Sequence, residues 1–348
     1  MTIDQLRTAM EAIDQPAFRA QQVADWVFRK AVTDPARMTN LPAALQQELS
    51  VVTSTVLARA DSTDGTIKLL VGYADGQSVE CVLIPEEKRA TACLSTQTGC
   101  AMACTFCASG MGGGGRNLTG GEILQQVLHL QQASSLRVSN AVFMGSGEPL
   151  ANYRGTLEAV RGLIDPLRLG ISARNVVVST IGLPEQIRRL AREKLPITLA
   201  ISLHAPNDAL RRRLMPKAQA SIDEILAAAG EFFESRSREV TLEYLLLAGV
   251  NDSALCAEGL ARLAHQIRCN VNLIRYNPVA DLPYQAPPRR TIEAFARRLQ
   301  DRGVNVQIRK PRGSDIAAAC GQLRRQHETE QDQAGQTDKT ETGDSAAD

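Results

Sequence analysis

Three cysteines stand close together in the segment GCAMACTFCASG: Cys100, Cys104 and Cys107. Their thiolates are soft ligands, and three of them can hold three irons of a four-iron cluster while the fourth iron keeps an open position. A structural zinc site usually takes four ligands, often as two separated pairs, and Cys93 could supply the fourth. The spacing therefore predicts metal chemistry, with an iron–sulfur cluster as the first interpretation and zinc as the alternative.

The chain from residue 90 onward alternates short apolar runs with amphipathic segments. The runs predict strands at 91–96, 140–145, 175–180, 197–203, 240–247, 271–276 and 304–308. The segments between them predict helices at about 119–134, 154–165, 184–194, 222–236, 254–268 and 290–302. Apolar strands separated by helices indicate a parallel sheet with covered faces. About six such units favour an incomplete β/α barrel over a full eight-fold one, which needs roughly 250 residues.

Polar residues recur where these strands end. They are the Cys100 loop, the segment 145–148, Ser179 and Thr180, Ser202 and His204, and Asn277. In parallel β/α folds, ligands bind in the loops at the carboxyl ends of the strands. We therefore expect these residues to surround one site.

Two further regions precede the alternating part. Residues 1 to about 50 predict a small helical domain in which Phe18, Val23, Trp26 and Val27 share one apolar face. The period-two stretches TIKLLVGY and SVECVLIP, joined at Asp75-Gly76, predict a β-hairpin.

Net charge divides the chain into two unlike parts. The 348 residues contain 39 Lys and Arg against 38 Asp and Glu, a net charge of +1. The tail, 326–348, has seven acids, one base and no large apolar residue, which predicts a disordered acidic segment at −6. Residues 1–325 therefore carry +7, which is compatible with a polyanionic partner.

Composition also bears on the compartment. No run approaches the roughly 20 apolar residues that span a bilayer, and the first residues have no signal-peptide core. We therefore expect a cytoplasmic protein without membrane contact. Eight cysteines in a reducing compartment are not expected to form a disulfide framework.

The motif series resembles the radical S-adenosylmethionine (SAM) superfamily and, within it, the RlmN/Cfr family of RNA methyltransferases, RlmN most of all. The matching segments run from residue 18 to about 323. They are FRAQQVADWVF, ACLSTQTGCAMACTFCASG, FMGSGEPLANY, VVVST, ISLHAPND, LMP, EYLLLAGVND, NLIRYNP and RKPRGSDIAAACGQL. Two features depart from the family pattern: four glycines at 112–115, and LMPKAQ, where an Asn usually follows soon after LMP.

The resemblance implies the fold class and the domains. We expect an α/β protein in which a partial (β/α)6 radical SAM barrel covers 90–325. An RNA-binding accessory helical domain would cover 1–50, and a hairpin linker carrying Glu80 would cover 51–89, with the tail at 326–348. The implied cofactors are one [4Fe-4S] cluster on Cys100, Cys104 and Cys107 and SAM on its open iron.

The resemblance also implies which residues contact SAM: Gly147, Glu148, Ser179, Ser202, Leu203, His204 and Asn277. A glycine lets the backbone approach a ligand closely, and a carboxylate accepts hydrogen bonds from an ammonium group. Taken singly, GSGEP is also an ordinary turn, and the other residues are ordinary strand-end caps.

Three catalytic roles follow from the same resemblance. Cys320 would be the S-methylcysteine intermediate, and Cys93 would be the partner thiol that accepts a proton and forms a transient disulfide with Cys320. Glu80 would be the proton acceptor from the substrate base. By composition alone, Cys320 and Cys93 are equally typical of small buried hydrophobes, and Glu80 of a solvated sheet face.

The implied activity is methylation of C2 of adenosine at position 2503 of 23S rRNA, in standard RNA numbering, and of adenosine 37 in tRNA. This carbon is electron-poor, which makes ordinary displacement unavailable, and the resemblance implies a radical route that uses two SAM molecules per turnover. The implied partners are rRNA, tRNA and an electron donor such as flavodoxin or ferredoxin, and the chain would be a monomer. Methylation of C8, as in the Cfr subgroup, is one alternative, and a non-catalytic zinc-stabilised RNA-binding protein is another.

Two basic groups could contact RNA phosphates. They are Arg211, Arg212 and Arg213 in one run, and Arg309, Lys310 and Arg312 shortly before Cys320. Such runs are also typical of solvated helix faces.

Overall fold

A computed structural model describes the chain except for residues 1–2, 237, 280, 311, 314 and 317–348. Cys320 and the acidic tail thus lie outside the described residues. Among the residues described, no helix is both long and apolar enough to cross a membrane.

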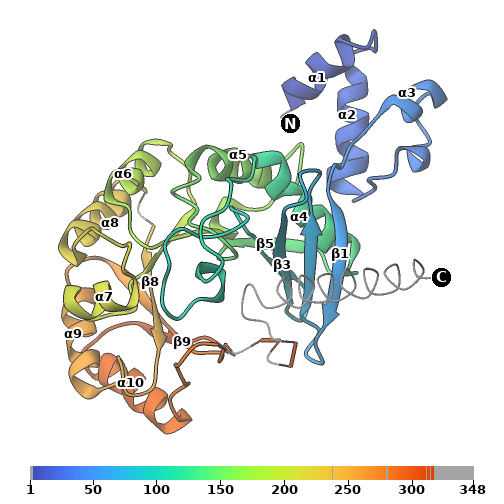
Figure 1. Ribbon diagram of the computed structural model, residues 1–348. Coiled ribbons are helices and arrows are strands. Elements are labelled where there is room, and N and C mark those ends of the chain that lie inside the picture. Colours follow the sequence, from blue (N-terminus) through green and yellow to red (C-terminus); the bar gives the residue numbers. More distant parts are fainter. Residues whose placement is uncertain (1–2, 237, 280, 311, 314, 317–348) are drawn as a thin grey trace, which may run out of the picture.

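One sheet of ten strands runs through the molecule, and its strands lie in chain order from β1 to β10. The strands are β1 (Thr55–Asp61), β2 (Ile67–Gly72), β3 (Ser78–Pro85), β4 (Ala90–Cys93), β5 (Val138–Phe143), β6 (Val176–Thr180), β7 (Thr198–Ser202), β8 (Val240–Leu246), β9 (Cys269–Arg275) and β10 (Val306–Ile308). Pairs from β1 to β4 are antiparallel, and pairs from β4 to β10 are parallel. The predicted incomplete barrel is confirmed: the sheet curves but does not close (Figure 1).

Helices wrap the outside of this curved sheet, while α1 to α3 form a separate group beside β1 (Figure 1). They are α1 (Ile3–Glu11), α2 (Phe18–Ala24), α3 (Ala43–Glu48), α4 (Gly120–Gln132), α5 (Tyr153–Ile164), α6 (Pro184–Arg192), α7 (Asp208–Leu214), α8 (Ile222–Arg236), α9 (Ala254–Ala264) and α10 (Arg289–Asp301). A π-helical turn, Asp25–Arg29, continues α2. The seven strands and six helices predicted from residue 90 onward are all present within a few residues of their predicted bounds.

Among the strands and α-helices that the structure describes, β1 and α7 were not predicted. Strand β1 is mostly exposed and lies at the sheet edge, so its residues carry no buried alternation that a pattern could reveal. Helix α7 has only seven residues, and its start depends on the Asn207 side chain, whose Oδ1 accepts from the backbone N of Leu210 at 2.9 Å. A cap of this kind satisfies an otherwise unpaired N–H and can define a helix too short to show periodicity.

The helix-facing side of the sheet forms the main core. Phe143 of β5, Leu199 of β7 and Tyr244 of β8 are fully buried there against the outer helices. The N-terminal helices have a smaller core of their own, to which α4 contributes Leu128. Val23 and Val27 are buried in it as predicted, but Phe18 is 58% exposed, so the predicted apolar face is wrong at that residue.

The opposite side of the sheet is the concave inner face, and it is polar. Strand register places Lys68, Val82, Cys93 and Val142 side by side across β2 to β5. Further along, register aligns Ser202 of β7, Glu243 of β8, Asn272 of β9 and Gln307 of β10. Direct neighbours across a sheet point to the same face. A row of polar side chains therefore lines the inner face.

Candidate active site

The three-cysteine loop follows β4 and is closed at its base by backbone contacts. The backbone N of Thr98 donates to the Arg116 carbonyl at 3.1 Å, and that of Cys100 donates to the Gly113 carbonyl at 3.0 Å. Gly115 packs so closely on Gly99 that a Cβ would lie 2.4 Å from the Gly99 nitrogen, and Gly113 has φ +74°. The glycine run at 112–115 thus has a structural reason at two of its positions.

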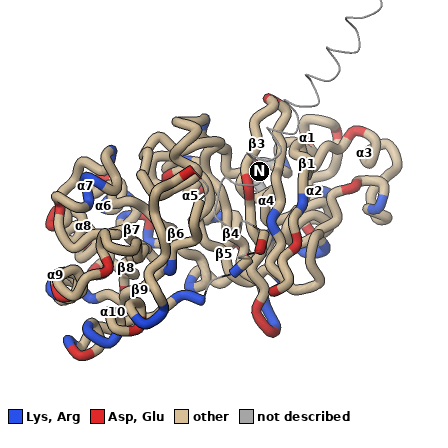
Figure 2. Tube along the Cα trace, turned by 60° about the horizontal axis from the view of Figure 1, so that its bottom comes forward, with Lys and Arg blue, Asp and Glu red and all other residues tan. Residues whose placement is uncertain are grey.

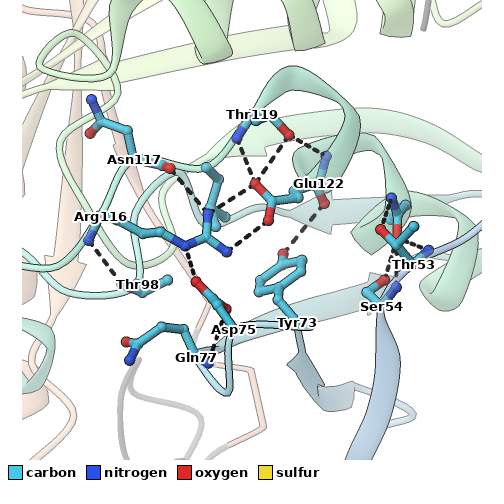
Figure 3. Close-up of polar contacts among 12 residues, drawn as sticks. Thr53, Ser54, Tyr73, Asp75, Gln77, Thr98, Arg116, Asn117, Thr119 and Glu122 are labelled. Atoms are coloured by element: carbon cyan, nitrogen blue, oxygen red, sulfur yellow. Dashed lines mark hydrogen bonds and ion pairs between the residues drawn. The ribbon is translucent and has the colours of Figure 1, made fainter.

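Arg116 ties the end of this loop to two other elements (Figure 3). Its guanidinium pairs with Asp75 in the β2–β3 turn and with Glu122 in the first turn of α4, the latter at 2.7 Å. Glu122 also forms a capping box with Thr119, in which each side chain accepts from the other residue's backbone N. These contacts fix where the cysteine loop ends and α4 begins.

The thiols of Cys100, Cys104 and Cys107 are free and half-buried within this loop. The charge of Cys107 acts to raise the pKa of Cys100 and of Cys104, and the charge of Cys100 acts to raise that of Cys104, so the three thiols lie close together. Among the residues described, no group of three or more His, Cys, Asp or Glu side chains is gathered tightly enough to hold a metal ion. The donor set nevertheless fits an iron–sulfur cluster, because three thiols share one loop fixed at its base.

The protonation of the thiols has a clear physical cause. Burial raises the pKa of Cys100 to about 11, and burial together with neighbouring thiols raises the pKa of Cys104. Thiolates are the metal-binding form, so a bound cation would offset this penalty.

Arg211 is buried, and its positive charge acts to lower the pKa of Cys104. It is 1% exposed and donates to the carbonyls of Ile181 and Ala220. The prediction that Arg211 could contact phosphate is therefore wrong, because its guanidinium is enclosed by backbone acceptors. Arg212 and Arg213 remain exposed.

The segment after β5 brings Glu148 near Cys100 and Cys104. Its buried carboxylate accepts from the backbone N of Leu150 at 3.0 Å and of Ile181 at 2.8 Å. Burial raises its pKa, and its charge acts on Cys100 and Cys104. Gly147 has φ +103°, and a Cβ there would lie 2.7 Å from the Gln97 side chain. Gly147 and Glu148 thus lie near the thiol of Cys100.

The other residues expected to contact SAM come from β6, β7 and the segment after β9. The hydroxyl oxygens of Ser179 and Ser202 are 3.3 Å apart on adjacent strands. Leu203 is fully buried, and its backbone N donates to the Glu243 carbonyl at 3.0 Å. Asn277 is half-buried two residues after β9 ends. All four lie at the carboxyl-terminal edge of the parallel strands.

His204 is held as a neutral imidazole. Its Nδ1 accepts from the backbone N of Leu245 at 3.1 Å, so the proton of the neutral ring is on Nε2. Burial and then the nearby charge of Arg211 lower its pKa to about 3. The ring also packs edge-on against Phe106, the residue before Cys107, with centroids 5.1 Å apart. His204 thereby links the end of β7 to the cysteine loop.

Glu80 is buried on the inner face and not solvated, which corrects the composition-based reading. Its Oε2 lies 3.1 Å from Nζ of Lys68, and the two side chains are 4% and 0% exposed. A charged pair needs partners when it leaves water, and here each ion compensates the other. Register places Cys93 directly across from Val82, which itself pairs with Lys68.

Two cations influence Cys93. Burial raises the pKa of its thiol to about 11, while Arg309 and Lys68 act in the opposite direction. Arg309 lies 3.9 Å from Oε2 of Glu243, a buried carboxylate that also accepts from Asn272 at 3.0 Å. Burial raises the pKa of Glu243.

The segment leading toward Cys320 is held by the turn between β1 and β2. The Asp315 carboxylate accepts from the Ser62 hydroxyl at 2.5 Å and from the backbone N of Thr63 at 2.9 Å. In return, Asp64 accepts from the backbone N of Gly313 at 3.0 Å. We call these reciprocal contacts the 62–64/313–315 clamp.

Sequence reasoning missed Lys68, Glu243 and the clamp. The Lys68 signal was available, because a turn centred on Asp75-Gly76 places residues 68 and 80 on the same side of the hairpin. Glu243 and Asp315 had no such signal, since their partners are 29 or more residues away along the chain.

Comparison with known proteins identifies the class first. Residues 94–257 match the radical SAM superfamily, and residues 1–54 match the ribosomal RNA large subunit methyltransferase N-terminal domain. A radical SAM methyltransferase from Sphaerobacter thermophilus superposes with a TM-score of 0.88 and 41% identity, covering 92% of this chain and 97% of that one. The open barrel and its thiol loop are therefore those of a radical SAM protein.

Proteins with similar sequences show which family the chain belongs to. The probable dual-specificity RNA methyltransferase RlmN of Rhodopirellula baltica is 45% identical over 331 residues, 93% of this chain and 89% of the relative. The protein of the same name from Symbiobacterium thermophilum is 46% identical over 333 residues, 93% and 90% of the two chains. The chain belongs to the RlmN family, which confirms the resemblance drawn from its motifs.

Proposed function

We propose that this protein methylates C2 of adenosine at position 2503 of 23S rRNA and at position 37 of tRNA. Family membership supports an RNA methyltransferase. The observation that carries the proposal further is the inner-face group of Glu80, Lys68 and Cys93, which places a carboxylate and a thiol together at the edge of the thiol loop.

Cys100, Cys104 and Cys107 would hold a [4Fe-4S] cluster, and Gly147, Glu148, Ser179, Ser202, Leu203, His204 and Asn277 would bind SAM. When bound, the cluster and two SAM molecules would supply the methyl group and the one-electron chemistry that an electron-poor carbon requires. Gly147 leaves room for close backbone approach, and neutral His204 holds the end of β7 against the cysteine loop. A small flavodoxin or ferredoxin would deliver the electrons.

Glu80 and Cys93 would complete the reaction with Cys320, the proposed methyl carrier. Once the carrier's carbon is joined to the ring and the adduct has lost one electron, which the cluster would accept, the Glu80 carboxylate would accept the proton at the ring carbon. The Cys93 thiolate would then attack Sγ of Cys320, so that an S–S bond forms and the S–CH2 bond breaks. The departing carbon keeps the electron pair of that bond and takes up a proton, which completes the methyl group. Lys68 and Arg309 favour the thiolate that this attack needs.

The clamp gives this proposal a structural basis near the carrier. The turn that holds residues 313 and 315 leads directly into β2, which carries Lys68. The chain entering the Cys320 segment is thus tied to the same hairpin as Glu80.

Anaerobic reconstitution with iron and sulfide, followed by SAM, a reductant and unmodified rRNA or tRNA, tests the proposal. Digestion of the RNA should yield 2-methyladenosine. Recovery of 8-methyladenosine would move the protein to the C8 reaction, and bound zinc without SAM cleavage would reject enzymatic function.

The carrier role has its own test. Cys320→Ala should abolish methylated RNA while the cluster absorbance and SAM cleavage persist. Cys256→Ala, which removes a half-buried thiol on α9, should retain product formation. Turnover by the Cys320 variant would show that another residue carries the methyl group.

A further inference from the structure

A cleft of about 1140 Å³ separates the N-terminal helices from the amino-terminal edge of the parallel sheet. One wall is the segment from Phe28 to Val32 together with Arg37. The other comprises the end of α4, the approach to β5 and the loop 166–170 after α5. These loops lie at the edge of the sheet opposite to the thiol loop, because they precede β5 and β6 and do not follow them.

Five cationic side chains line the cleft, and its described lining contains no Asp or Glu: Arg29, Lys30, Arg37, Arg137 and Arg168. Two acids stand nearby. Asp25 lies 3.4 Å from Arg29, and Asp165 acts on Arg168. Lys30 lies over the Trp26 ring at 3.5 Å, a contact that leaves its charge available. Figure 2 shows that Lys and Arg occur on the N-terminal helices as well as on the outer helices.

Arg168 is the feature that distinguishes the cleft from an ordinary basic surface. It is 4% exposed, and its Nε is buried without a hydrogen-bond partner among the described residues. Its guanidinium packs over the Phe28 ring at 5.0 Å. Removing a charged donor from water is unfavourable unless an acceptor reaches it. An anion in the cleft would reduce that penalty.

We propose that this cleft binds the sugar–phosphate backbone of the RNA substrate at a point remote from the target base. The proposal rests on the proposed RNA substrate and adds a second contact site. Cations and polar groups such as Ser135 suit phosphate oxygens, and among the described residues that line the cleft Phe28 is the only aromatic ring for stacking. The contact would therefore add affinity without reading sequence.

Arg37→Ala combined with Arg137→Ala is the sharpest variant, since both side chains are exposed and neither has a carboxylate partner among the described residues. The matched control is Arg192→Ala with Arg297→Ala, which removes the same charge from exposed positions on α6 and α10. Affinity for full-length tRNA and for an anticodon-arm hairpin is measured over a range of salt concentrations.

The cleft variant should bind full-length tRNA several-fold more weakly than the control variant. Its slope of log affinity against log salt should be shallower by about 1 to 2, as expected for one or two lost phosphate contacts. Equal slopes and affinities for the two variants would overturn the proposal. If inorganic phosphate binds in the wild-type cleft but leaves the affinity for tRNA unchanged, the cleft is a site for small anions instead.

Methylation of the hairpin distinguishes a failure of the cleft proposal from a failure of the proposed function. If the wild-type protein methylates the hairpin and the cleft and control variants bind tRNA equally, only the proposal for the cleft is rejected. Wild-type protein that methylates neither RNA rejects the proposed function, whatever the binding data show.

Discussion

The two faces of the sheet are stabilised in different ways. The helix-facing side is filled with apolar side chains such as Leu83, Phe143 and Tyr244, which are stabilised by burial alone. The inner face buries Lys68, Glu80 and Glu243, whose burial is unfavourable unless charges and hydrogen bonds compensate it. Core packing thus sets the shape of the barrel, whereas pairwise compensation on the inner face holds reactive groups in place.

This difference has a consequence for substitutions. A residue of the helix-facing side loses stability in proportion to the apolar contact removed. On the inner face, removing one member of an ion pair takes away a charge that compensates its buried partner, whereas removing both can be nearly neutral.

Lys68→Met should have the largest effect, because it removes the cation that lies 3.1 Å from the buried Glu80 carboxylate. We expect a loss of about 3–5 kcal/mol, similar to the range of about 2–5 kcal/mol for Leu83→Ala on the other face. Lys68→Met combined with Glu80→Leu should recover most of that stability and still make no product. Urea unfolding measures all three; a single Lys68→Met variant as stable as wild type would mean that the pair is not a compensated ion pair.

Cys93 should make stability depend on alkaline pH. Its thiol pKa is raised from 9.0 to about 11 in the folded state, so the folded protein keeps a proton that the unfolded chain releases between those values. Its contribution is therefore complete below about pH 9 and is lost as pH rises toward 11, by roughly 2–3 kcal/mol at most.

Cys93→Ala should lack this part of the alkaline decline, while Cys256→Ala should keep it. Unfolding of the reduced, metal-free protein at pH 8 to 11 compares them. Parallel curves for wild type and Cys93→Ala would contradict the raised thiol pKa.

Glu243→Gln should change stability by less than about 1 kcal/mol, because an amide keeps a partner for Asn272 and carries no charge to desolvate. Methylated RNA per SAM cleaved should nevertheless fall, since Arg309 loses the acid beside it. Glu239→Gln is the control, an exposed acid just before β8 that pairs with Arg268. If the two variants give the same amount of methylated RNA per SAM cleaved, Glu243 does not position Arg309.

Asp315→Ala should have the smallest effect on stability, since Asp315 is itself exposed and contacts the exposed Thr63. It should lower methylated RNA per SAM cleaved, because the segment before Cys320 loses its attachment to the 62–64 turn. Asp61→Asn, which alters an exposed pair with Arg59 on neighbouring β1, is the matched control. An unchanged product ratio in Asp315→Ala would show that the clamp does not guide the carrier.

Much of the fold was predictable because its signals are local. The parallel strands and their helices follow from apolar periodicity, and Asp75-Gly76 specifies the hairpin turn, where Gly76 has φ +78°. The run of Arg211, Arg212 and Arg213 shows what such local signals cannot predict. Three identical residues carry no information on which one the fold encloses, and only the positions of Ile181 and Ala220 make it Arg211.

The sequence by itself determined the family, the order of the elements and the residue types at each strand end, because motifs and periodicity are properties of neighbouring residues. The tertiary structure decided that Glu80 is buried against Lys68, that Arg309 stands beside Glu243, and that Asp315 is held by a turn some 250 residues away. Burial and pairing depend on which distant segments the curved sheet brings together, and a local pattern does not encode that proximity.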